Sequence, residues 1–163
     1  MRDKLQFVLL PMLLVVIMFL GRLLLGLALG VNKSSYDLAN RLFSMVIFQV
    51  HVGLLWGAVG RKYRGYGLGG SIVAVVLVTI LSQALIFAGT ALSYVAHVDT
   101  LFTFPEALNS TTPVPFAEAL VRRTATFVTN CVLVGVVGSI GWMLGRFLPG
   151  GVGTTEKREA AVL

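Results

Sequence analysis

The sequence predicts an all-α integral membrane protein, a four-transmembrane-helix bundle, on three observations. Charged residues make up 12% of the 163 residues and hydrophobic residues 56%, whereas a soluble domain carries about 25% charged residues. Four segments are predominantly apolar over the roughly 20 residues that cross about 30 Å of hydrocarbon. The 18 glycines fit the same class, because small residues let membrane helices approach each other closely.

The first expected span covers residues 5–30. Its charged start, with Arg2 and Lys4, also fits a signal peptide, but the apolar run is longer than the ~7–15 residues of a signal-peptide core. We therefore expect a retained helix.

Arg22 interrupts this first span and has two interpretations. Its long side chain could extend to the headgroups while its stem stays in the apolar region. Alternatively, it could form an ion pair with a carboxylate of the outer segments, from Asp37, Asp99 or Glu106. Both interpretations stay open, and Arg22 is a candidate site residue because charged groups inside a membrane are costly.

The second expected span, residues 38–60, has two distinct faces. Gln49 and His51 lie roughly 200° apart on a helix that turns about 100° per residue. The Gln49 face holds Gly53, Gly57 and Gly60, and the His51 face holds Ser44 and Ala58. We expect the first face to pack inside the bundle and the second to meet another chain. His51 could also be a hydrogen-bonded packing residue, or a weak candidate for a ligand to a metal or pigment.

The third and fourth expected spans, residues 68–95 and 124–148, carry stripes of polar and small residues. The stripe of the third span includes Ser82 and Gln83, and the stripe of the fourth span includes Asn130 with several glycines. Hydrogen bonding between helices explains such a stripe more simply than a pore lining. Residues 1–148 would then form one transmembrane domain, and residues 149–163 a flexible cytoplasmic tail.

The distribution of lysine and arginine predicts that both termini are cytoplasmic, in the cell's inner (plasma) membrane. With the N-terminus inside, the cytoplasmic cations are Arg2, Lys4, Arg61, Lys62, Arg64, Arg146, Lys157 and Arg158. The outer cations are Lys33, Arg41, Arg122 and Arg123. Arg122 lies four residues after Glu118, the spacing of an ion pair on a helix. Cations that flank spans face lipid headgroups, so the positive charge does not indicate nucleic acid.

The functional prediction is a structural or accessory subunit of a membrane assembly, as a homo-oligomer or within a larger complex. We expect no enzyme, because the sequence lacks catalytic and phosphate-binding motifs. We also expect no cofactor and no metal. A proton-driven exporter is disfavoured, since the spans carry no carboxylate away from their ends. The alternatives are a small oligomeric transporter or channel that uses the third span's polar stripe, and a cofactor-binding subunit that uses His51.

Overall fold

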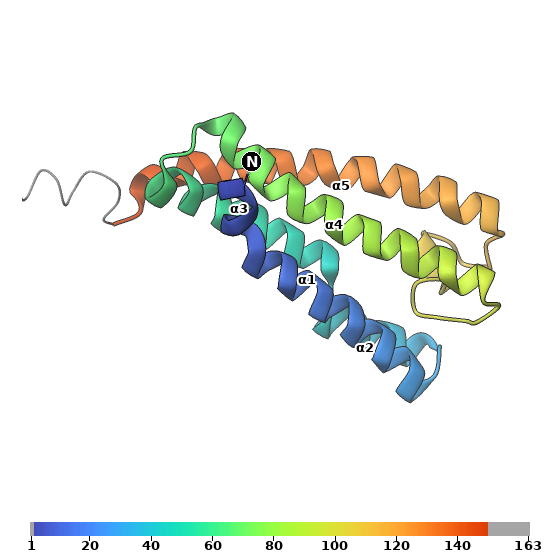
Figure 1. Cartoon of the computed structure of the whole chain (residues 1–163). Coiled ribbons are helices and arrows are strands. Elements are labelled where there is room, and N and C mark those ends of the chain that lie inside the picture. Colours follow the sequence, from blue (N-terminus) through green and yellow to red (C-terminus); the bar gives the residue numbers. More distant parts are fainter. Residues whose placement is uncertain (1, 150–163) are drawn as a thin grey trace, which may run out of the picture.

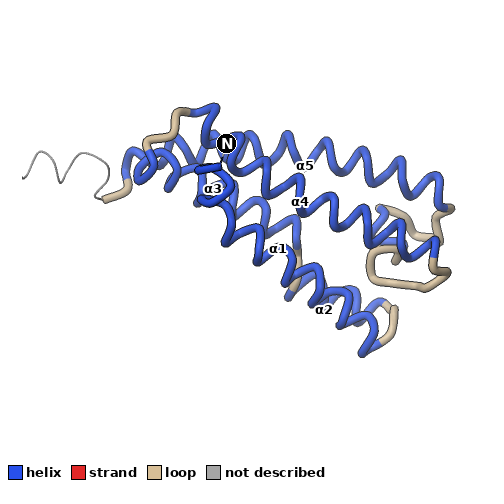
Figure 2. Tube along the Cα trace, viewed as in Figure 1, coloured by secondary structure: helices blue, strands red, loops and turns tan. Residues whose placement is uncertain are grey.

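The computed structural model describes residues 2–149, and all regular structure in that range is helical (Figures 1 and 2). The elements are α1 (Arg2–Leu29), α2 (Lys33–Leu42), α3 (Met45–Arg64), α4 (Leu68–Val95), α5 (Phe116–Leu144) and the 3-10 turns η1 (Pro105–Leu108) and η2 (Gly145–Phe147). Four stretches are long and apolar enough to cross a membrane: Asp3–Leu29, Lys33–Arg64, Leu68–Val95 and Phe116–Phe147. Most of the expected tail, residues 150–163, lies outside the described residues.

The second stretch contains a break that the sequence analysis did not anticipate. Asn32 caps α2, because its side chain accepts a hydrogen bond from the Ser35 backbone N–H at 3.0 Å. Ser44 caps α3 through a longer bond from the Ile47 N–H, 3.4 Å. Ser44 therefore lies at the break between α2 and α3. It does not belong to a packing face that runs along one continuous helix. As a result, the short α2 lies against α1 and buries Tyr36 and Ala39.

Glycines bring the backbones of α3 and α5 into direct contact. A Cβ added at Gly57 would lie 2.5 Å from the carbonyl oxygen of Gly138. A Cβ at Gly141 would overlap the backbone of Leu54, and one at Gly145 would lie 2.6 Å from the carbonyl oxygen of Ala58. Only hydrogen fits at these positions, which agrees with the expected packing role of the small residues.

The prediction that Ala58 shares the outward face of His51 is wrong. Ala58 is buried against α5 and η2 rather than exposed beside His51. The reason is that α3 packs against α4 on one side and α5 on another, so its buried arc is wider than one stripe.

The two ends of the molecule differ in shape (Figure 1). At the terminal end, the start of α1, the turn after α3 and the end of α5 lie together. At the opposite end, which we call the loop end, α1 and α2 diverge from α4 and α5, and the segment 96–115 lies at this end. Leu101, Phe102 and Leu108 of this segment are buried, with at most 2% of their surface exposed. The segment between α4 and α5 therefore forms part of the core.

The last long helix begins at Phe116 rather than near residue 124 as expected. Arg122 and Arg123 consequently lie within helix α5, on its second turn, and do not simply flank it. This shift matters because successive helical residues face different directions, so the two arginines have different surroundings.

Candidate functional site

Three of the predicted polar candidates meet between α3 and α4. Gln49 donates from Nε2 to Ser82 Oγ at 2.6 Å, and Gln83 donates from Nε2 to Gln49 Oε1 at 3.3 Å. All three side chains are buried, with at most 2% exposed. The helices thus hold each other through side-chain hydrogen bonds in the interior.

Other polar residues of the α4 stripe bond to their own helix. The hydroxyls of Thr79, Thr90 and Ser93 each donate to the backbone carbonyl four residues earlier, at 3.3, 2.9 and 2.6 Å. Hydroxyl groups that bond in this way need no water or second helix. Gln83 also borders an open, mostly apolar groove of about 400 Å³ with Phe87 and Phe127.

His51 lies on the opposite side of α3 from Gln49, as the 200° separation predicts. It is exposed among the apolar residues Ile47, Leu54 and Leu55, and its Nδ1 lies 2.8 Å from the Ile47 carbonyl oxygen. A carbonyl only accepts, so Nδ1 donates this hydrogen bond, and Nε2 is left free on the exposed side of the ring. Within the described residues, His51 makes no hydrogen bond to another helix.

Asn130 is buried in α5, with 6% of its surface exposed, and its Nδ2 has no hydrogen-bond partner. It therefore does not join the hydrogen-bonded group around Gln49. A buried amide without a partner costs free energy.

Arg22 fits neither of the two expected interpretations. It is buried, with 8% exposed, so its side chain does not extend along the outer surface of α1. Its guanidinium donates to Asn40 Oδ1 at 2.8 Å and to the Leu101 carbonyl at 3.3 Å. Its Cζ lies 5.2 Å from the Tyr36 ring centroid and 5.6 Å from that of Phe102.

The carboxylates expected beside Arg22 have other positions. Asp37 and Glu106 both pair with Lys33, at 2.9 and 3.2 Å. Asp99 lines a separate pocket and forms no ion pair within residues 2–149. On α2, Tyr36 and Asn40 lie four residues apart on one face and contact Arg22, whereas Asp37 lies on another face.

Arg123 has the same kind of environment, which the sequence analysis missed. It is 9% exposed, and it donates to Thr90 Oγ1 at 3.0 Å and to the Phe102 carbonyl at 2.6 Å. Its neighbour Arg122 forms the predicted pair with Glu118, at 2.6 Å. The sequence spacing could have predicted this burial. Arg123 lies seven residues before Asn130, so both residues lie on the same buried face of α5.

The two buried arginines line one pocket of about 120 Å³ at the loop end, together with Tyr36, Asn40, Ser44 and Phe102. None of the described residues that line it is acidic. Cationic side chains from α1 and α5, two helices far apart in the sequence, thus line the same pocket.

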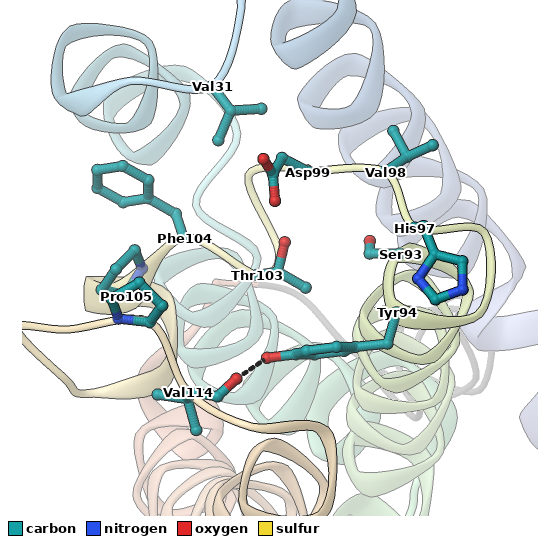
Figure 3. A pocket seen from close by; sticks show the side chains of 11 residues that line it. Val31, Ser93, Tyr94, His97, Val98, Asp99, Thr103, Phe104, Pro105 and Val114 are labelled. Carbon is teal, nitrogen blue, oxygen red and sulfur yellow. Dashed lines mark hydrogen bonds between the residues drawn. The ribbon is translucent and has the colours of Figure 1, made fainter.

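A larger pocket of about 470 Å³ lies beside it at the loop end (Figure 3). Figure 3 shows Asp99 and Thr103 turned towards the same space, with His97 at its edge. Tyr94 closes one side by donating a hydrogen bond to the Val114 carbonyl. Among residues 2–149, no group of histidine, cysteine and carboxylate side chains has the arrangement of a metal site.

Comparison of the chain with protein-family models, with curated proteins and with solved structures finds no match.

Proposed function

We propose that the protein is an integral membrane protein whose four long apolar stretches cross the plasma membrane, with both termini in the cytoplasm. The exposed surface of these helices supports this proposal, because it consists largely of leucine, isoleucine and valine side chains, which lipid tails solvate better than water does. The orientation is supported by the basic residues near the terminal end, which include Arg61, Lys62, Arg64 and Arg146.

Cysteine labelling tests this orientation. Gly67→Cys and Thr111→Cys place a thiol at exposed positions of the two ends, in a Cys131→Ala background that removes the only native thiol. An impermeant thiol reagent applied to intact cells should label residue 111 and spare residue 67. The opposite labelling pattern would place the termini outside.

We further propose that the protein acts as a structural or accessory subunit of a membrane assembly. The observation that carries this proposal is the mutual hydrogen bonding of Gln49, Ser82 and Gln83 in the interior. A transporter or channel would need these groups to line a water-filled path, so their burial and mutual hydrogen bonding support the structural role over that alternative.

The face of α3 around His51 is the place where we expect the partner to dock. An exposed imidazole among Ile47, Leu54 and Leu55 is costly in lipid. Because Nε2 has no partner within residues 2–149, the matching partner is an apolar helix with a polar side chain at the same depth that can hydrogen-bond to this ring nitrogen.

Native mass spectrometry in mild detergent tests the accessory role. The wild type should retain a partner, and His51→Leu should lose it while the monomer stays folded. Thr129→Val is the matched control, since Thr129 is also exposed and also bonds to the carbonyl four residues earlier. A wild type that runs as a bare monomer, or a His51→Leu complex of unchanged mass, would contradict the proposal.

A further inference from the structure

Two buried positive charges share the 120 Å³ pocket without a negative partner. Arg22 and Arg123 are 8% and 9% exposed and both line it. The ion pairs within residues 2–149 go to Lys33 and Arg122 instead. Uncompensated buried charges are costly, and two like charges at one pocket repel each other.

The two guanidinium groups also keep unused donors. Each carries five N–H bonds, and each makes two hydrogen bonds, all to neutral oxygens. The Nε of Arg22 is buried and has no hydrogen-bond partner among residues 2–149. Buried donors are normally satisfied, so the unused N–H groups of Arg22 and Arg123 indicate that the pocket holds an additional acceptor.

We infer that this pocket binds a phosphate group, held between Arg22 and Arg123. Arginine is the side chain best suited to a buried oxyanion, because its planar fork of donors matches two oxygens at once. Two forks from different helices suit the tetrahedral arrangement of phosphate oxygens. The Asn40 amide and the Ser44 hydroxyl, which also line the pocket, add donors for the same group.

The size and position of the pocket limit the source of the phosphate. Its volume of about 120 Å³ is several times the ~10–15 Å³ that one water molecule needs in a cavity, so a phosphate group fits. Val46 lines the pocket at the start of α3 and is 39% exposed, so the site opens at the joint between α2 and α3. The phosphate of a lipid headgroup and free inorganic phosphate can both enter there.

Thermal unfolding of the delipidated full chain in detergent tests the inference. The melting temperature is measured against inorganic phosphate, and separately against a short-chain phosphatidylglycerol, at constant ionic strength. A ligand at ten times its dissociation constant should raise the melting temperature by about 3–6 °C. A rise with lipid alone assigns the site to a headgroup, and a rise with both shows that the free anion also binds. No rise with either probe would overturn the inference.

Variants of neighbouring arginines separate binding from general charge effects. Arg22→Gln and Arg123→Gln should abolish the rise, whereas Arg122→Gln should keep it, because Arg122 lies outside the pocket. If a glutamine variant does not fold, Arg22→Lys and Arg123→Lys replace it, since they keep the charge and lose the fork. The lysine variants should raise about tenfold the concentration of phosphate or phosphatidylglycerol that gives half of the full rise in melting temperature. Unchanged half-saturation in both lysine variants, or an equal loss in Arg122→Gln, would overturn the inference.

Discussion

The terminal end and the loop end of the bundle differ in how closely their helices approach each other. At the terminal end, α3 and α5 touch through glycines, and the absence of side chains permits the contact. At the loop end the helices separate, and arginine side chains bridge the gap to the backbone of Leu101 and Phe102. Backbone contact between helices thus depends on residues without side chains, whereas the separated end leaves pockets between its bridging groups. Hydrogen bonds from arginine to a carbonyl occur at both ends, since Arg61 donates to the Trp142 carbonyl at 3.2 Å.

The largest expected effect comes from filling the glycine contact. Gly141→Ala places a Cβ against the backbone of Leu54, which cannot move without separating α3 from α5. We expect a loss of about 3 kcal/mol or more in the free energy of unfolding, or failure to fold. Thermal unfolding in detergent and the yield of folded protein measure it.

Gly135→Ala is the matched control in the same helix, because no atom lies within 4 Å of the added Cβ. It should leave stability unchanged or raise it by up to about 1 kcal/mol through helix propensity. Equal losses in Gly135→Ala and Gly141→Ala would show that the terminal end does not depend on backbone contact.

A smaller effect is expected at the loop end from Arg22→Lys. Lysine keeps the charge but cannot donate in one plane to both Asn40 and the Leu101 carbonyl. We expect a loss of about 1–3 kcal/mol, the range for hydrogen bonds that involve a charged group. Arg146→Lys, an exposed change at the terminal end, should stay within about 0.5 kcal/mol of the wild type. A stable Arg22→Lys would mean that charge alone, without the planar fork, holds the loop end.

The same two ends show how far the sequence could be used for prediction. Helical period and residue size place Gln49 and the glycines inside and His51 outside, because these properties depend only on positions along one helix. The separation of α2 from α3 was missed, since a capping serine within an apolar run has the same hydropathy in a continuous helix. Arg123 was missed because charge near the end of a span was interpreted as exposure, although its spacing from Asn130 indicates burial.

The burial of the loop segment could not have been predicted from local pattern. Leu101 and Phe102 follow a polar stretch and precede prolines, which is typical of an exposed connection. Their position depends on the divergence of α1 from α4, with Leu101 against Gly26 and Phe102 stacked on Phe19 at 5.1 Å. Such contacts join residues far apart in the chain and arise only when the helices pack.

The smallest expected effect is at Asn130, between the two ends, and the Gln49 group provides its comparison. Gln49→Met removes two interhelical hydrogen bonds and should cost about 1 kcal/mol, given the ~0.6 kcal/mol average for such bonds in membrane proteins. Asn130→Leu keeps nearly the same shape but removes an amide whose Nδ2 has no partner. Its stability in the same unfolding measurement should therefore stay within about 0.5 kcal/mol of the wild type, or increase. A loss above about 1.5 kcal/mol would show that Asn130 bonds to an ordered water or a bound group, and that this part of α5 belongs with the polar loop end rather than with the glycine contact.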